Sequence, residues 1–583
     1  MNYKHYIYTA VAVLTASVAA LSVSCTKIED YPDGRISQDD LFTTDRKTFM
    51  YLNTCYDALQ NKLYGMWYGN SAFMDAFTDN ASDAQVVNNS ASYQWYQGSV
   101  TPYGNPLESG NNGNWWQGFF SGIRYCNVFL ANIDDAYVYS EGSRIKWTAE
   151  ARTLRAFYYL QIIKRYGKAP ISLEEYAADY DYSQVTFAPF SQIVKEVIIP
   201  DCEAALDVDD IYFGWRSGSS EMSRGEMNKA IACIVMSEAA LYAASPLYND
   251  GTVSWAEAAD ITKRAMDNLK AHGYELFNKT NSNFPGAYGF YFGSRSDVQG
   301  ATDPETIFEI RNRTEMYKYH GIPTIVGAVS AGNCPSQELV DCFETIDGVR
   351  PILGYSDANH LQPKINPNAV LYDEAHPYAN RDPRLDAIVL YNDATISTAL
   401  GKVETGVGGA HEISSGNTRY TRTGYYLRKY LNVRSNERSN LDGYFKLYRY
   451  AEALLNYAEA AAEASSTVPE AAYAAVNEVR ARAGMPDLPV GLSKEEFLER
   501  VRNERRVEFA FEDSRFYDVR RWQKLSETDR VVTGMRPTDN GYERFVVDTR
   551  NCYEDKFLLS PIPGDEVIRV LNYTGVDIQN PGW

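Results

Sequence analysis

The sequence predicts a mainly helical fold with a long loop-rich insertion. Apolar residues recur at three- and four-residue steps near both ends of the chain, a spacing typical of amphipathic helices. Between them, residues 277–442 are rich in Gly, Asn, Ser, Asp and Tyr and show few such stretches. We therefore expect a helical part over 45–276, a loop-rich ligand-binding region over 277–442, and a second helical part over 443–583.

The first helical part shows the periodicity most clearly. Phe49, Leu52, Tyr56 and Leu59 share one helical face, and Gly167 ends another periodic stretch as a natural helix stop. The expected helices are 45–63, 115–131, 150–166, 191–206, 224–243 and 255–271. Helices that arrive in pairs with short connections indicate an antiparallel scaffold, although the chain lacks a self-similar 34-residue repeat signature.

The middle of the chain offers only short strand-like runs, at 306–310 and 387–391. Long ordered loops on a rigid helical body are where binding usually occurs, so we place the ligand there. Helices are predicted to resume at Gly443, with further helices at 469–483 and 494–512.

Charged residues extend the apolar stripe of the last of these helices. Glu504, Glu508 and Arg515 follow Phe497 and Val501 on the same face. Half-buried charges must be paired, since removing one partner strands the other, so we expect a structural role for them. In the segment 380–384, Asn-Arg-Asp-Pro-Arg, the proline is expected to fix a turn whose charges satisfy loop carbonyls.

The N-terminus reads as a secretory signal over 1–24. An apolar run from Tyr6 to Val23 follows Lys4 and ends in small residues before Cys25. The sequence around Cys25 resembles a bacterial lipobox, which implies that this cysteine carries acyl chains and anchors the protein through a tether over 25–44. A retained membrane helix is the alternative. Seven cysteines remain, an odd number, and only Cys334 and Cys342 are close enough to suggest a disulfide.

Composition narrows the function classes. With 45% hydrophobic and 23% charged residues the chain is globular. Its net charge of -20 argues against nucleic acid as a partner, because such binding needs Lys and Arg to neutralise phosphates. The 45 tyrosines and 9 tryptophans provide rings that either complete a core or line a binding face.

Enzyme motifs are absent from the sequence. We find no His-Glu-x-x-His zinc motif, nucleophile elbow, phosphate-binding loop or dinucleotide fingerprint, and therefore expect no catalytic residues, metal or cofactor. A glycoside hydrolase is the serious rival, because it needs only two carboxylates about 5–10 Å apart. Asp75 and Asp79, separated by one helical turn and flanked by Phe73 and Phe77, are the candidates, with solvated surface carboxylates as the alternative interpretation.

Several short sequence motifs follow one another along the chain. They are Glu150-Ala-Arg-Thr-Leu-Arg-Ala-Phe-Tyr-Tyr, Pro335-Ser-Gln-Glu-Leu-Val-Asp341, Asn380-Arg-Asp-Pro-Arg-Leu385, Thr423-Gly-Tyr-Tyr-Leu-Arg-Lys-Tyr430, Val479-Arg-Ala-Arg-Ala-Gly484 and Glu504-Arg-Arg-Val-Glu-Phe-Ala-Phe-Glu512. These motifs span most of the chain, and together they resemble the RagB/SusD family, in which they occur in the same order. The resemblance implies a fold with four TPR-like helix pairs. It also implies a lipid-anchored outer-membrane protein, facing the cell exterior, that sits as a lid on a SusC-like TonB-dependent barrel and binds glycans or, occasionally, peptides.

A glycan site needs exposed rings beside hydrogen-bonding side chains, and two loop segments offer both. The candidate residues of the first segment and its upstream neighbours are Trp67, Tyr68, Asn89, Trp95 and Tyr96; those of the second are Tyr291, Arg311, Tyr317 and Tyr319. The family's ligand contacts lie outside its landmark motifs, so composition and context alone select these residues. The alternative is that these rings pin loops to the body. Trp115 and Trp116, which open a helix, are expected in the core.

Overall fold

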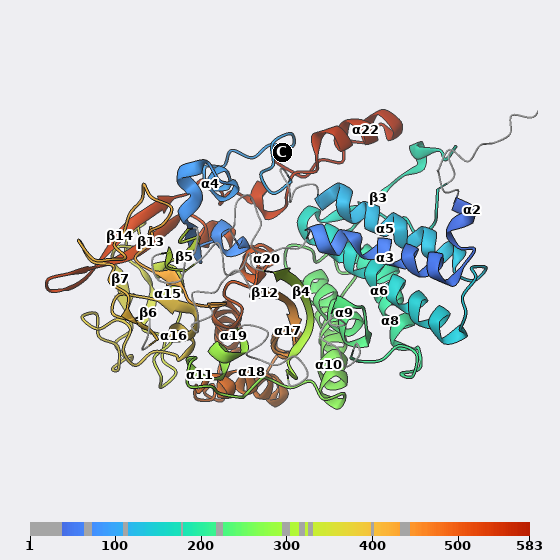
Figure 1. Cartoon of the computed structure of the whole chain (residues 1–583). Coiled ribbons are helices and arrows are strands. Elements are labelled where there is room, and N and C mark those ends of the chain that lie inside the picture. The colour runs from blue at the N-terminus through green and yellow to red at the C-terminus, as the bar shows by residue number, and fades with distance from the viewer. Residues whose placement is uncertain are drawn as a thin grey trace, which may run out of the picture.

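The fold is mainly helical, as the sequence predicts, with short strands in the connecting regions (Figure 1). The structure is a computed structural model that describes residues 38–62, 73–108, 115–176, 179–216, 225–293, 303–313, 321–323, 330–397, 401–431 and 443–583. Cys25 and the signal-like run lie outside these residues. Within the described ranges, none of the helices combines the length and apolarity needed to span a membrane.

Eight of the described helices form a continuous array in which each packs on the one before it. They are α3 (Asp45–Lys62), α5 (Trp115–Asn132), α6 (Glu141–Tyr166), α8 (Ile199–Leu206), α9 (Lys229–Ala244), α10 (Trp255–Ala271), α17 (Tyr450–Ala464) and α18 (Glu470–Ala483). Figure 1 shows the array running from α3 and α5 on the right to α18 at the bottom. Four consecutive helix pairs result, which confirms the expected scaffold.

The array is built from both ends of the sequence. Helix α9 is buried along its whole length and is rich in Ala, so neighbouring helices approach it closely on all sides. Its first turn is closed by Asn228, whose side chain accepts a hydrogen bond from the Ile231 N–H. Helix α17 packs on both α9 and α10, although more than 170 residues separate it from them in sequence. The C-terminal part therefore completes a core that the N-terminal part begins.

The remaining described helices lie outside this array. They are α2 (Gln38–Leu41), α4 (Ala91–Tyr96), α7 (Phe190–Ile193), α11 (Gly286–Tyr291), α15 (Gln337–Val340), α16 (Arg384–Ile388), α19 (Lys494–Glu508), α20 (Ser514–Arg521), α21 (Leu525–Thr528) and α22 (Gly564–Thr574). The 3₁₀ turns are η1 (Met74–Phe77), η2 (Ala84–Asn88), η4 (Tyr182–Gln184) and η9 (Asp555–Leu558), and η5 (Val194–Ile198) is a π turn.

All strands in the described residues form two-stranded antiparallel pairs. The pairs are β1 (Ala81–Asp83) with β5 (Asn333–Pro335), β2 (Lys168–Pro170) with β3 (Phe187–Pro189), β4 (Thr306–Arg313) with β12 (Gly443–Arg449), β6 (Ile352–Tyr355) with β7 (Pro363–Ile365), β8 (Val389–Leu390) with β11 (Tyr426–Leu427), β9 (Thr395–Ser397) with β10 (Gly401–Lys402), and β13 (Val531–Thr538) with β14 (Gly541–Thr549). No extended sheet forms among them, so the loop-rich region depends on side chains for order.

Several helix boundaries differ from the sequence predictions. Helix α6 begins at Glu141, earlier than the expected 150, and α9 begins at Lys229, later than the expected 224. Three other differences have a structural cause. The helix expected from Gly443 begins at Tyr450, because residues 443–449 pair with β4 as strand β12. The helix expected over 494–512 ends at Glu508, and Phe511 adopts a left-handed backbone with φ 62°. The helix expected over 191–206 is divided by the π turn. Tertiary pairing and local backbone geometry override the helical periodicity at these places.

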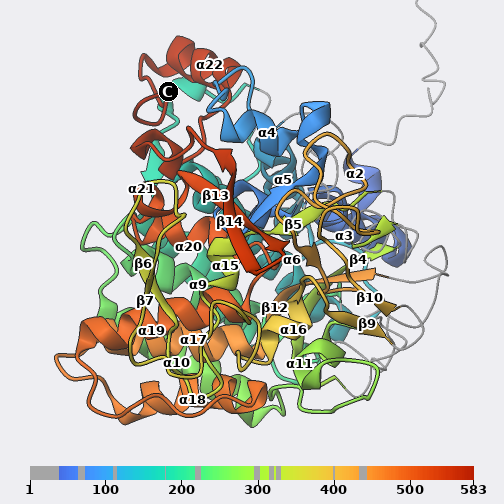
Figure 2. The ribbon, with the colours of Figure 1, turned by 90° about the vertical axis from the view of Figure 1, so that its left-hand side faces the viewer.

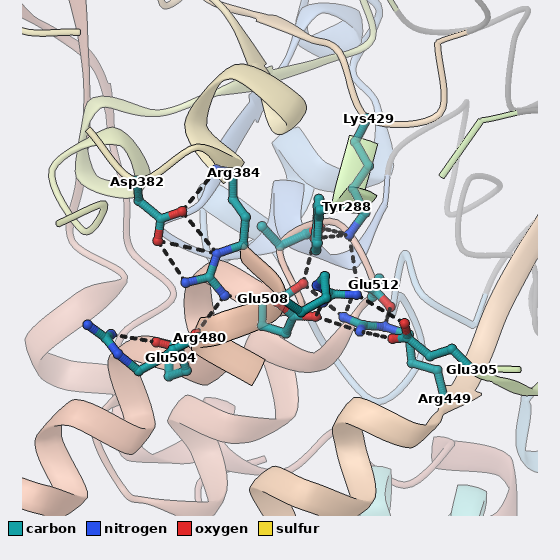
Figure 3. A network of polar contacts seen from close by, with 12 residues as sticks. Tyr288, Glu305, Asp382, Arg384, Lys429, Arg449, Arg480, Glu504, Glu508 and Glu512 are labelled. Atoms are coloured by element: carbon teal, nitrogen blue, oxygen red, sulfur yellow. Dashed lines mark hydrogen bonds and ion pairs between the residues drawn. The ribbon is translucent and has the colours of Figure 1, made fainter. Parts of the chain in front are cut away.

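A buried ionic network joins the loop-rich region to the helices (Figure 3). Arg384 donates to Glu504 at 2.6 Å, to Glu508 at 2.9 Å and to Asp382 at 2.7 Å. Glu508 also pairs with Arg449 at 2.6 Å. Burial favours protonation of Glu508, but Arg482, Arg449 and Arg384 outweigh it and hold its pKa below the usual range.

The network confirms the structural role predicted for these charges. Glu504 and Glu508 are fully paired inside the protein, and Arg515 pairs with Asp79 at 2.9 Å. In the proline-containing turn, Arg381 donates to the carbonyls of Phe343 and Val340, as expected. The other two charges of that turn, Asp382 and Arg384, belong to the network instead.

Cys334 and Cys342 are free thiols in the structure. Cys334 is buried, with its Sγ 3.6 Å from the Gly332 carbonyl, whereas Cys342 Sγ lies 3.2 Å from the Glu338 carbonyl. The two side chains therefore have separate partners.

Candidate ligand-binding groove

A surface groove of about 430 Å³ lies between the β13–β14 hairpin and the loop that contains residues 405–415. Figure 2 shows the hairpin facing the viewer at the centre of the molecule. The lining residues are Thr405, Gly406, Val407, Glu412, Ile413, Ser415, Arg422, Arg536, Pro537, Phe545, Val546 and Val547. Its volume falls within the range of about 300–1,000 Å³ typical of small-molecule sites.

Arg422 fixes one wall of the groove. Its guanidinium donates to Asp548 Oδ1 on β14 at 2.9 Å and also to Ser82 Oγ on β1. Ser82 in turn donates to Asp548 Oδ2 at 2.7 Å. Because all three side chains are at most partly exposed, this triangle holds β1, the groove loop and the hairpin in one arrangement.

Close backbone contact holds the hairpin against the segment that follows Arg422. Met535 N–H donates to the Thr423 carbonyl at 2.8 Å. Gly424 adopts φ 88°, and a Cβ placed there would lie 2.0 Å from the Met535 carbonyl oxygen. Only glycine fits this position, which explains why a Thr-Gly dipeptide precedes strand β11.

The groove combines an apolar surface with charged groups. The Arg536 guanidinium lies over the Phe545 ring, 4.3 Å from its centroid, and is 47% exposed. Pro537 and Val546 extend the apolar side. Among the described lining residues Glu412 is the one carboxylate.

A second ion pair anchors the hairpin to α15. Arg544 donates to Asp341 through two hydrogen bonds, of 2.7 and 2.9 Å. Burial raises the pKa of Asp341, but the Arg544 guanidinium outweighs burial and keeps that pKa below its usual value. The ionised, bidentate pair therefore helps to hold the hairpin in position.

The structure corrects the expected placement of Trp95 and Tyr96. Both lie in helix α4 rather than on an exposed loop, and both side chains are fully buried. Trp95 packs against Phe516 and Phe557 at centroid distances of 5.7 and 5.5 Å. The helical spacing of this short aromatic run places the rings toward the core, so neither offers a face to a ligand.

Asn89, the next sequence candidate, is exposed to solvent. It ends the η2 turn in a left-handed conformation with φ 52°, and its carbonyl accepts a hydrogen bond from Gln94 Nε2 at 3.1 Å. Ser82, which contacts the groove residue Arg422, lies a few residues upstream on β1. Asn89 itself is not among the residues that line the groove.

The second predicted segment is largely internal where it is described. Tyr291 belongs to helix α11, is fully buried, and shares a hydrogen bond of 2.7 Å with Thr306 Oγ1. Its placement on an exposed loop is therefore wrong, for the same reason as for Trp95. Arg311 lies on β4 opposite Tyr444. Trp67, Tyr68, Tyr317 and Tyr319 lie outside the described residues.

Asp75 and Asp79, the carboxylates considered for hydrolysis, are both buried rather than solvated. Asp79 pairs with Arg506 and Arg515 at 2.9 Å each. Asp75 accepts hydrogen bonds from Asn80 and from the Phe511 N–H. Their partners show that these two carboxylates hold η1 against the helices. Trp115 and Trp116 are in the core, as predicted.

The groove residues Arg422, Arg536 and Phe545 were not among the sequence candidates. The sequence does contain a signal for the β13–β14 hairpin, because Asp539-Asn-Gly541 is a strong hairpin-turn sequence between two strand-like runs. The pairing of that hairpin with the loop around Thr405 has no local signature. Only the folded arrangement brings these segments together.

The fold and groove define a helical-scaffold protein with a loop-built surface site, and comparison with known proteins gives its family. Residues 304–583 match the model of the "SusD family", and residues 39–208 match a model described as "Starch-binding associating with outer membrane". The chain belongs to the SusD family, as its landmarks indicated. A "SusD-like protein P2" from Formosa agariphila is 33% identical over 156 residues, which cover 26% of this chain and 28% of that protein.

Solved structures share the whole fold. A SusD-like protein from Bacteroides fragilis has a TM-score of 0.74 at 23% identity, covering 94% of this chain and 99% of that chain. A SusD-like carbohydrate-binding protein from the same species has a TM-score of 0.68 at 22% identity, covering 91% and 99%. At these identities the likeness establishes the fold.

Proposed function

We propose that this chain is a cell-surface protein that binds an oligosaccharide or polysaccharide in the groove and delivers it to a TonB-dependent SusC-like transporter in the outer membrane. Membership of the SusD family carries this proposal. The printed description of one structural relative, a carbohydrate-binding SusD-like protein, supports the ligand class.

The chemistry of the groove suits a sugar. Phe545, Pro537 and Val546 offer an apolar surface to the C–H face of a pyranose ring. Arg536 and Glu412 stand beside it as hydrogen-bond donor and acceptor for hydroxyl groups. Such a combination of apolar lining and a few polar groups fixes a neutral ligand in one orientation.

Calorimetry against a panel of soluble polysaccharides and oligosaccharides tests the groove. Arg536→Ala removes a charged donor, so we expect the affinity for the bound sugar to fall about tenfold to a hundredfold. Arg264→Ala is the matched control, because Arg264 is similarly exposed, at 56%, but lies on α10 outside the groove. Equal affinities of both variants and the wild type would reject the groove as the binding site.

The same samples separate the alternatives. Shorter oligosaccharides that accumulate with time would assign the protein to the glycoside hydrolases instead. A peptide library in place of the sugars tests the peptide-binding alternative, and tight binding of peptides with no binding of any glycan would select it.

The proposal includes lipid anchoring at Cys25, which the signal-like N-terminus supports. A palmitate analogue should label the wild type, whereas Cys25→Ala should lose the label and leave the outer-membrane fraction. Unchanged fractionation of the variant would contradict anchoring at this residue.

Partnership with the transporter is tested by affinity purification in mild detergent. A large outer-membrane barrel protein should accompany the tagged chain. Recovery of the chain alone in several detergents, with and without glycan, would contradict this part of the proposal.

A further inference from the structure

Four tyrosines form a cluster on the surface outside the groove. Tyr176 and Tyr180 stack with centroids 4.0 Å apart and an interplanar angle of 22°. Tyr182 meets Tyr180 edge-on at 5.2 Å, and Tyr573 lies 5.8 Å from Tyr182. The first three come from the connection between β2 and β3, and the fourth from the end of α22. We call these four residues the tyrosine cluster.

The cluster remains accessible to solvent. Tyr573 is 57% exposed and Tyr182 46%, and the other two rings are partly exposed. This differs from Trp95 and Tyr291, whose rings complete the core. Large aromatic rings that gather in one exposed patch are typical of binding sites. Single exposed rings, in contrast, are common on any protein surface.

Helix α22 holds the cluster in place. Its Val567 and Val570 pack against the main core, while Ile568 and Leu571 face solvent. Contacts between α22 and the η4 turn bring Tyr573 beside Tyr182. Figures 1 and 2 both show α22 at the top of the molecule, away from the β13–β14 hairpin. The rings are thus supported from two separate chain segments, which presents them in a fixed arrangement.

The charges around the rings restrict the ligand. The segment 171–186 contains Glu174, Glu175, Asp179 and Asp181 and has no Lys or Arg. An anionic polymer would be repelled there. The exposed Gln184, whose side chain donates to Ser183 Oγ at 2.9 Å, adds an uncharged hydrogen-bonding group next to Tyr182. The rings, the neighbouring carboxylates and Gln184 together match the C–H faces and hydroxyls of a neutral sugar.

We infer that the tyrosine cluster is a second binding site for a neutral glycan, distinct from the groove. The inference rests on the proposed function, since it assigns the same ligand class to another surface. None of the four tyrosines is among the residues that line the groove. A long polymer that occupies both sites gains affinity because the second contact becomes intramolecular, whereas a short oligosaccharide occupies one site at a time.

Binding of long and short neutral glucans to the full chain tests this inference, with laminarin and its short oligosaccharides as probes and alginate as the anionic comparison. Tyr182→Ala with Tyr573→Ala should lower the affinity for the long chain about tenfold and leave the short oligosaccharide's affinity for the groove unchanged. Tyr182→Trp should keep the long-chain affinity. Tyr139→Ala, which removes an 87% exposed tyrosine outside the cluster, is the matched control.

The outcomes separate this inference from the proposed function. Loss of long-chain binding in the double variant, with an unchanged Tm, supports the cluster even if Arg536→Ala has no effect. Wild-type affinity of the double variant, with Arg536→Ala impaired, overturns the cluster and leaves the groove. Loss of the copurified transporter in the double variant, with glycan binding intact, also overturns it by assigning the rings to a protein interface.

If the wild type binds none of a panel of neutral glycans, the proposed function fails and the inference fails with it. Should the double variant melt early, Tyr573→Ala alone serves the same test.

Discussion

The helical array and the loop-rich region are stabilised in different ways. In the array, backbone groups are satisfied within each helix, so small residues such as those of α9 suffice to bring helices together. The loop-rich region has only two-residue to eight-residue strands and a smaller apolar cluster around Phe343, Leu390 and Tyr425. Its order depends on polar side chains that reach across the chain.

Buried arginine side chains provide many of these hydrogen bonds. Arg381 donates to the carbonyls of Phe343 and Val340, and Arg550 donates to the Thr78 and Ala81 carbonyls. The carbonyls of Phe343 and Thr78 lie outside the helices and strands, and a buried unpaired carbonyl is costly. Irregular backbone can therefore be made rigid enough to carry a binding site when buried guanidinium groups replace secondary structure. Charged guanidinium groups inside the protein also need carboxylate partners, and Arg384 and Arg449 have them in the network of Figure 3.

The largest loss of stability is expected from a substitution where the helical array and the loop-rich region are joined. Arg384→Met would leave Glu504 and Glu508 without one shared cation, so we expect a loss of about 3–5 kcal/mol in the free energy of unfolding. Urea denaturation followed by fluorescence measures it. A loss below 1 kcal/mol would show that the remaining arginines neutralise both carboxylates and that apolar packing alone joins the regions.

A somewhat smaller effect is expected within the apolar core. Trp95→Ala removes a fully buried ring from contacts with Phe77, Phe516 and Phe557, at a cost of about 3 kcal/mol. Tyr93→Ala, on the same helix but 36% exposed, should cost less than about 1 kcal/mol. Similar melting temperatures for the two variants would mean that Trp95 does not belong to the core as described.

The free energy of unfolding is expected to depend on pH because of one carboxyl group inside the helical array. Burial raises the pKa of Glu150 to about 7, against the opposing effects of Lys146 and the hydrogen bond from Tyr56. Between its ordinary pKa and 7 the folded protein holds a proton that the unfolded chain has released, so stability falls as the pH rises through this window.

The glutamine side chain of Glu150→Gln cannot ionise, so this variant should not lose stability over that pH range. Its stability relative to the wild type should increase between pH 5 and pH 7 by on the order of 2 kcal/mol. Urea denaturation at several pH values measures the difference, and Glu141→Gln on the same helix, whose side chain is 73% exposed, is the control. A constant difference across this range would contradict the raised pKa.

The smallest effect is expected on the surface of the array. Lys263 and Asp267 form an exposed ion pair one turn apart on α10. Lys263→Ala should change the free energy of unfolding by less than about 0.5 kcal/mol, because solvent screens the pair. A loss of several kcal/mol would show that surface charges, and not only buried ones, stabilise this protein.

Local periodicity in the sequence determined most of the scaffold. The helices at 45–63, 115–131 and 255–271 agree with α3, α5 and α10 nearly to the residue, because each carries a continuous apolar stripe and short-range signals suffice to define it. Glu504 and Glu508 were recognised as structural for a related reason, since their position on an apolar stripe requires buried partners.

Only the tertiary structure decided which aromatic rings face solvent. Trp95 and Tyr291 lie in Asn- and Gly-rich sequence that is typical of loops, yet short helices turn their rings into the core. The groove joins Arg422 to Phe545 and Arg536 from the distant hairpin, and the tyrosine cluster joins Tyr182 to Tyr573. Contacts between residues more than a hundred positions apart depend on how the whole chain packs, and no local pattern records them.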